Sequence, residues 1–123
     1  MRFRAGSPRP LIWRGTSKSD YMAFPATVQR EMGYALFLAQ AGKRHATMAK
    51  TLKGFGGGTV VEVKETYGGD AYRAIYTVRL AEAVYVLHAF QKKSKTGVKT
   101  PKADVNLIGK RLKDLIEERE RRL

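Results

Sequence analysis

One continuous stretch, residues 69–93, constrains the fold more than any other part of the chain. It reads Gly-Asp-Ala-Tyr-Arg-Ala-Ile-Tyr-Thr-Val-Arg-Leu-Ala-Glu-Ala-Val-Tyr-Val-Leu-His-Ala-Phe-Gln-Lys-Lys, and its β-branched and aromatic residues are typical of strands on a half-buried sheet. We predict two strands, residues 71–79 and 83–90, joined by a tight turn. If they pair antiparallel, the start of the first strand and the end of the second lie at the same edge of the sheet.

Cationic side chains interrupt the apolar pattern of this strand pair at that shared edge. Arg73 lies early in the first strand, and His88 with the Lys92–Lys93 pair ends the second. An arginine is seldom buried unless it is paired. Arg73 therefore either pairs with a carboxylate, for which Glu62 is the candidate, or points into a functional groove. Strict alternation also places His88 on the face that carries the valines of its own strand.

The other elements follow from hydrophobic spacing and from helix and turn signals. We expect a strand at 11–13, followed by a short helix that starts within 16–20 and ends at 24, and a second helix at 26–40. Further along the chain we expect a strand at 60–65 and a last helix from 101 to about 119. Residues 42–53 are expected to form a basic connector. The glycine-rich run 54–58 is expected to form a turn, because no helix and no Gly-Lys-Ser/Thr follows it.

This order of elements predicts a single α+β domain over residues 1–123, with a small antiparallel sheet packed against N-terminal helices and a C-terminal helix. Residues 1–9 are expected to be a flexible basic lead-in. Two isolated side chains have competing interpretations. Trp13 could stack on bases, but a place in the core is favoured. His45 could be a general base, but an exposed loop histidine is favoured.

The net charge of +13 limits the class of partner. Such a surface suits nucleic acid phosphates, anionic lipid or an acidic protein, and we favour nucleic acid because the basic residues are interleaved with core positions. The chain has no cysteine, which excludes disulfides and thiolate metal sites. No run reaches the roughly 20 apolar residues of a membrane span, and no signal peptide is recognisable. We expect a cytoplasmic protein with no metal, cofactor or membrane partner.

Several segments resemble one known family. Residues 25–40, 50–54, 70–76, 84–93 and 100–111 together resemble the phage-derived branch of the RelE/HigB-like toxins of type II toxin–antitoxin systems, and the run Leu-His-Ala-Phe-Gln-Lys-Lys at 87–93 is the most specific part. The resemblance covers residues 10–115. It implies the RelE-like toxin fold, in which helices pack on one face of the sheet and the other face holds mRNA.

The resemblance also implies an activity and partners. It implies an mRNA interferase that cuts messages, typically in the ribosomal A site. It also implies that a helix-turn-helix antitoxin, encoded by the neighbouring gene, neutralises this toxin. Metal-independent cleavage uses the 2′-OH as nucleophile, and it needs a base, cations around the phosphate and an acid for the leaving 5′-oxygen. The basic residues that the family uses for this chemistry suit the present chain.

The resemblance assigns site residues by position in this chain. Arg73 matches the sheet arginine of the RelE pattern and would clamp the phosphate. Lys92 and Lys93 match the position of a catalytic arginine after the last strand, and Lys53 falls near lysines that precede the second strand. His88 would shuttle a proton, or it is a hydrogen-bonded core residue. The predicted RNA-binding residues are Lys50, Phe90, Gln91 and Lys95; Tyr76 is expected to pack rather than to stack on bases.

The chain departs from RelE at its C-terminal end, where a lysine-rich loop and a long helix replace the RelE tyrosine. The acid–base assignment of RelE is therefore not transferred directly. Two alternatives stay open. A gyrase-poisoning ParE-like toxin would share the fold, but it would lack the cations on the sheet. A non-enzymatic nucleic-acid-binding phage protein would explain the charge of +13 but would give Arg73 and His88 no special role.

Overall fold

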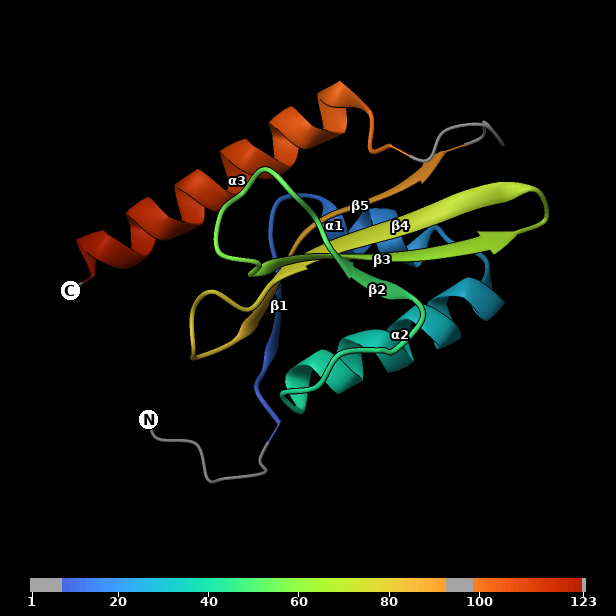
Figure 1. The fold of residues 1–123 in the computed structure, drawn as a ribbon, viewed down its shortest axis with the longest axis horizontal. Helices are drawn as coiled ribbons and strands as arrows, with labels where there is room; N and C mark the ends of the chain where they lie inside the picture. The colour runs from blue at the N-terminus through green and yellow to red at the C-terminus, as the bar shows by residue number, and fades with distance from the viewer. Residues whose placement is uncertain (1–7, 93–98, 123) are drawn as a thin grey trace.

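The computed structural model describes residues 8–92 and 99–122. The predicted α+β class is confirmed. Figure 1 shows a sheet with α2 on one side and α3 on the other. The elements in chain order are β1 (Leu11–Trp13), α1 (Ser17–Met22), α2 (Ala26–Gln40), β2 (Ala49–Thr51), β3 (Val60–Tyr67), β4 (Asp70–Thr77), β5 (Val84–Lys92) and α3 (Lys102–Arg121).

The sheet has five strands in the order β1-β5-β4-β3-β2. Strands β3, β4 and β5 pair antiparallel, as predicted, and the unpredicted β2 pairs antiparallel with β3, whereas β1 adds to β5 in parallel. The expectation of a wholly antiparallel sheet is wrong for β1. A tight hairpin forces two strands to be antiparallel, but several helices and strands separate β1 from β5 in the chain, so this pair can be parallel. The expected connector 42–53 contains β2, whose three residues are too short to show an alternating pattern.

The core between the sheet and the N-terminal helices is built from α2. Val28, Met32 and Leu36 recur at helical spacing and are buried against Val63 and Tyr76. The partly buried Trp13 packs on this cluster, with its ring centroid 5.2 Å from that of Tyr21. Its predicted place in the core is confirmed, and so is the packing role of Tyr76, which is 1% exposed.

The opposite face of the sheet is covered by α3. Ile108, Leu112 and Leu115 pack on Ile75 and Leu87 in a second buried cluster. The resemblance led us to expect that this face is open to mRNA, so its partial cover by α3 is a correction. The apolar stripe of a long helix needs a partner surface, and this sheet face supplies it.

A one-residue register shift divides the β4–β5 pair. Tyr76 lies opposite Val86, whereas Ile75 lies opposite His88, so Leu87 is the additional residue. Such a bulge turns every following side chain of its strand to the other face. The prediction that His88 shares a face with Val86 is therefore wrong: Val86 belongs to the α2 core, and His88 lies opposite Ile75 of the α3 core.

The N-terminal segment is tied to α2 where it is described. Residues 1–7 of the expected flexible lead-in lie outside the described residues. Its last residue, Arg9, donates its backbone N–H to the Gln40 carbonyl at 2.8 Å and accepts from the Gln40 side chain at 2.7 Å. None of the helices within the described residues is long and apolar enough to cross a membrane.

Candidate active site

Cross-strand pairing gathers the basic side chains on the face of the sheet that α3 covers. Directly opposite residues of neighbouring strands share a face. One row joins Lys64, Arg73 and Phe90. The rows on either side contain Lys50, Glu62, Ile75 and His88, and Thr66, Ala71 and Lys92. We call Lys50, Lys64, Arg73, His88 and Lys92 the cationic cluster.

Arg73 lies at the centre of the cluster and is fully buried, with 0% of its surface exposed. Its Nη1 donates to Glu62 Oε2 at 3.1 Å and to Thr100 Oγ1 at 3.4 Å. Thr100 in turn donates to Glu62 Oε2 at 2.8 Å. The paired state, one of the two alternatives left open by the sequence, is the one observed. Thr100, two residues before the start of α3, thus closes over the arginine.

His88 is held by the first turn of α3. Its Nε2 lies 2.7 Å from Asp104 Oδ1, and its ring stacks on Phe90 with centroids 4.9 Å apart. Its Nδ1 is buried and has no hydrogen-bond partner among the described residues. A carboxylate that fixes one ring nitrogen and leaves the other without a partner is the arrangement that proton-transferring histidines use.

The lysines of the cluster surround the Arg73–Glu62 pair. Lys50, Glu62 and Lys64 line a hollow of about 230 Å³ on the β2–β3 side of the face. Lys92 lies at the far end of β5, where its Nζ donates to the Lys99 carbonyl at 3.4 Å. Glu62 is thus bonded to Arg73 and, with 12% of its side chain exposed, also borders a space that a phosphate could enter.

Lys53 is not brought to the cluster. The residue before it, Leu52, bonds to Val60, and Val60 lies opposite Thr77. Thr77 is four positions along β4 from Arg73, about 13 Å at about 3.3 Å per residue. The resemblance placed Lys53 by its position in the chain, whereas the pairing of β2 directs the end of that strand away from Arg73.

The catalytic candidate Lys93 and the RNA-binding candidate Lys95 lie outside the described residues. The other predicted RNA-binding residues lie in different places. Phe90 faces α3. Gln91 is the next residue of the strand, so its side chain lies on the opposite face, where it donates to Asp70 Oδ2 at 2.7 Å. A second hollow, of about 350 Å³, brings His88, Phe90 and Gln91 together beside α1.

His45 and the glycine-rich run 54–58, which were both considered for a functional role in the sequence, have structural roles. The ring nitrogen Nδ1 of His45 accepts from the backbone N–H groups of Thr47 and Met48, at 3.2 and 3.0 Å, so the residue stabilises a turn. The predicted turn at 54–58 is confirmed: Gly54, Gly56, Gly57 and Gly58 all adopt the left-handed backbone that favours glycine.

Three functional candidates were not selected from the sequence. Asp104 is far from His88 in the chain, and no sequence signal joins the two. Lys64 lies in the strand expected at 60–65, but it was not among the candidate site residues. Glu62 was noted as a partner for Arg73 but not as a reactive group.

Comparison with known proteins places the chain in a family. Residues 19–113 match the model of a family described as phage derived protein Gp49-like (DUF891). The chain belongs to the Gp49-like family. No curated protein shows a significant match to it.

The fold of this Gp49-like chain is that of a known toxin. A solved structure of Escherichia coli toxin RelE in the free state, in which two arginines are replaced by alanine, superposes with a TM-score of 0.52. The two sequences are 17% identical, and the matched region covers 67% of this chain and 81% of the RelE chain. The family match and this shared fold confirm the resemblance to the phage-derived branch of RelE/HigB-like toxins.

Proposed function

We propose that this Gp49-like protein is the toxin of a type II toxin–antitoxin system and acts as an mRNA interferase. The observation that carries the proposal is that Arg73, bonded to Glu62, lies in the row next to the one that contains Glu62 and His88, so two potential proton-transfer groups, Glu62 and the His88–Asp104 pair, lie on the same face as the arginine. Lysines from three strands border the same face. The antitoxin is expected to be a helix-turn-helix protein, and the substrate is mRNA, bound to the ribosome.

Arg73 and the lysines supply the charge that the phosphate needs. A guanidinium presents a planar pair of N–H donors that matches two phosphate oxygens. Attack by the 2′-OH increases the negative charge on the phosphoryl oxygens, so fixed cations stabilise the transition state more than the ground state. Lys50 and Lys64, which line the hollow beside Glu62, hold the approaching phosphate.

The two proton transfers are assigned to Glu62 and His88, which lie in the row of residues next to Arg73. Glu62 and His88 flank Ile75 in one row, so their backbones lie about 10 Å apart across two strand spacings. Glu62 takes the proton of the 2′-OH. His88 delivers a proton from Nδ1 to the leaving 5′-oxygen, and Asp104 stabilises the imidazolium that carries it. The P–O5′ bond breaks as the bond from O2′ to phosphorus forms, which leaves a 2′,3′-cyclic phosphate and a 5′-OH.

Access of RNA to this site requires movement of the start of α3. Arg73 is fully buried, and Thr100 and Asp104 contact the site residues from the segment that begins α3. We therefore propose that residues 100–104 separate from the sheet when RNA binds, and that a phosphate then replaces Glu62 and Thr100 as the partner of Arg73. Glu62 is released as a base in the same step.

The two alternative functions fit these residues less well. A gyrase-poisoning ParE-like toxin needs no cationic cluster on the sheet. A non-enzymatic nucleic-acid-binding protein needs no carboxylate on a buried histidine. The distinction is experimental, because likeness of fold does not establish activity.

The test is induction of the protein in cells, followed within minutes by mapping of RNA 5′ ends. We expect growth arrest and cuts in translated messages for the wild type, and neither for Arg73→Ala. Arg79→Ala, which changes an exposed arginine after β4, is the matched control and should behave as the wild type. Because Arg73 is buried and paired, His88→Gln serves as a second variant whose fold is easier to preserve. Arrest without RNA cuts, or with signs of DNA damage, would support the gyrase alternative instead.

A further inference from the structure

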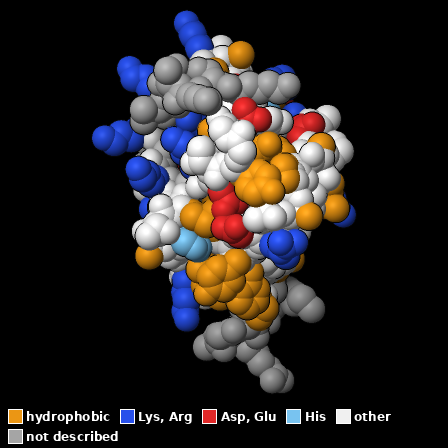
Figure 2. Space-filling view, turned by 90° about the vertical axis from the view of Figure 1, so that its right-hand side faces the viewer, with side chains coloured by type: hydrophobic (Ala, Val, Ile, Leu, Met, Phe, Trp, Pro, Cys, Tyr) orange, Lys and Arg blue, Asp and Glu red, His pale blue; other side chains and the backbone are white. Residues whose placement is uncertain are grey.

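An aromatic surface lies on the side of the sheet opposite the candidate active site. Tyr34 and Phe37 of α2 and Tyr67 at the end of β3 are 56%, 54% and 45% exposed. Residues three apart on a helix are neighbours, so Tyr34 and Phe37 form one patch. In Figure 2, hydrophobic side chains gather above and below acidic side chains on one face of the molecule. Apolar side chains gathered in this way commonly mark a protein interface.

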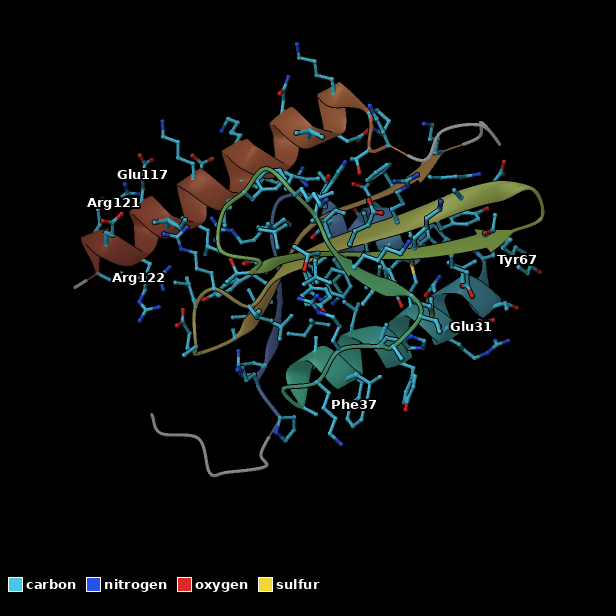
Figure 3. The ribbon with its side chains drawn as sticks, viewed as in Figure 1. Glu31, Phe37, Tyr67, Glu117, Arg121 and Arg122 are labelled. Carbon is cyan, nitrogen blue, oxygen red and sulfur yellow. The ribbon has the colours of Figure 1, made fainter. Side chains whose placement is uncertain are left out.

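A pair of carboxyl groups lies within this surface. Glu31 of α2 and Glu65 of β3 share a side-chain hydrogen bond. Glu65 and Tyr67 are two positions apart on β3 and therefore share the face that carries Val63 of the α2 core. Figure 3 shows Glu31 on α2 close to Tyr67 at the tip of the β3–β4 hairpin, with Phe37 further along α2.

Within residues 8–92 and 99–122, no ion pair joins a basic side chain to Glu31 or Glu65. Burial, the hydrogen bond to Glu31 and the charge of Glu31 together raise the pKa of Glu65 to about 7, and no basic group counteracts them. Glu65 Oε2 is buried without a hydrogen-bond partner among the described residues. By contrast, Glu62, Glu82 and Glu118 each bond to an arginine of the chain. Asp20, Asp70, Glu117 and Glu120 also form no ion pair within the described residues, but Glu65 is the carboxyl group whose pKa is raised.

The chemistry of the surface specifies its partner. A carboxyl pair that holds a proton near pH 7 is completed by a Lys or Arg, which replaces the proton. Exposed aromatic side chains around it favour apolar contacts, and aromatic residues with a central charge pair are typical of interface hot spots. An acidic surface disfavours nucleic acid phosphates. The expected occupant is therefore a protein segment that presents a basic residue among apolar side chains.

We propose that the surface formed by Glu31, Tyr34, Phe37, Glu65 and Tyr67 binds the antitoxin through such a basic and apolar segment. The proposal rests on the part of the proposed function that assigns an antitoxin. The surface lies on the α2 side of the sheet, whereas the cationic cluster lies on the α3 side (Figure 1). The antitoxin bound here does not contact Arg73 or His88.

The test measures the dissociation constant between the purified chain and the protein encoded beside its gene. Glu31→Lys should weaken binding at least about tenfold, because it brings a like charge against the basic residue of the partner. Glu117→Lys makes the same charge reversal at an exposed position of α3 and should stay within about threefold of the wild type. Phe37→Ser should also weaken binding, and thermal unfolding checks that each variant is folded. Free Glu31→Lys should still cut RNA at the wild-type rate.

Three results would overturn the inference. One is equal binding by Glu31→Lys and Glu117→Lys. Another is the absence of any binding between the wild type and the neighbouring protein. The third is sedimentation that shows the wild type to be a dimer and Glu31→Lys a monomer. In that case a second copy of this chain, and not the antitoxin, binds the surface. If the wild type cuts no RNA but Glu31→Lys loses binding, the inference stands and only the proposed nuclease activity fails.

Discussion

His88 Nε2 and Asp104 Oδ1 lie 2.7 Å apart, and this contact joins the last strand of the sheet to the first turn of α3. It has two consequences. The carboxylate orients the imidazole and can stabilise its protonated form, which suits a proton donor to the leaving oxygen. The same contact holds the start of α3 over the site, so the chemistry and the closure of the site involve one pair of residues.

Asp104→Asn tests the chemical role of this contact. The amide can keep a hydrogen bond to the ring but cannot stabilise the imidazolium, so we expect the rate of RNA cleavage to fall about 100-fold with little loss of stability. The measurement is single-turnover cleavage of an RNA oligonucleotide. Asp114→Asn, at a residue of α3 that bonds to Lys110, is the control and should keep the wild-type rate. Equal rates for the two variants would remove His88–Asp104 from the mechanism.

Hydrogen exchange tests the closure. The Val105 amide donates to the Pro101 carbonyl at 3.0 Å in the first turn of α3, whereas Leu112 and Leu115 are in the buried cluster further along. Binding of an RNA with a 2′-deoxy substitution at the cleavage site, which cannot react, should increase exchange at Val105. Exchange at Leu112 and Leu115 should not increase. Slower exchange at Val105 would mean that RNA binds without displacing this segment.

Lys64 tests the placement of the phosphate. It lies opposite Arg73 and lines the hollow beside Glu62. Lys64→Ala should weaken RNA binding and reduce the slope of log K against log salt by about 0.7, the value for one phosphate of a single strand. Binding titrations at several salt concentrations give this slope. Lys113→Ala removes an exposed lysine from α3 and should leave the slope unchanged, and a similar change in both variants would contradict the assignment.

Glu65 predicts a pH dependence of stability. Burial and Glu31 raise its pKa from an ordinary value of 4.5 to about 7. The folded state then binds a proton that the unfolded state releases between these values, so stability is lost as pH rises from 4.5 through 7. Glu65→Gln should therefore stabilise the fold at pH 8, on the order of 1 kcal/mol because the group is partly screened, and by much less at pH 5. Thermal unfolding at the two pH values measures this.

Glu120→Gln is the control for Glu65→Gln, because Glu120 is exposed on α3. It should leave the melting temperature nearly unchanged at both pH values. A Glu65→Gln variant that is less stable than the wild type at pH 8 would show that the carboxyl pair has a cation partner in the folded protein.

The sequence predicted the α+β class and most elements because their periodic apolar residues also form the two cores. Val28, Met32 and Leu36 in α2 show this, as do Ile108 and Leu112 in α3. The sequence also placed Arg73 and His88 at the same end of the β4–β5 pair, and they lie in adjacent rows of that pair. The parts that were missed depend on pairing between distant segments, such as the parallel addition of β1 and the short β2.

The composition of the site was harder to predict for the same reason. The additional residue Leu87 moves His88 to the face of Arg73, and no residue type marks that bulge in the sequence. Asp104 reaches His88 only because α3 packs across the sheet. The family resemblance assigned Lys53 to the site by its position in the chain, but the strand pairing places it far from Arg73. Local patterns predict elements, whereas register and helix docking decide which side chains meet.

Cleavage of RNA by attack of its own 2′-OH leaves characteristic chemical groups at the cut ends, and these can be identified. The purified wild type and His88→Gln are incubated with ribosomes that carry a defined mRNA, with and without EDTA at a concentration that preserves the ribosomes, and the 3′ ends of the upstream fragments are analysed by mass spectrometry. We expect 2′,3′-cyclic phosphate ends for the wild type, insensitive to EDTA, and few cuts by His88→Gln. Fragments that end in 3′-OH, or cuts by His88→Gln at the wild-type rate, would contradict it.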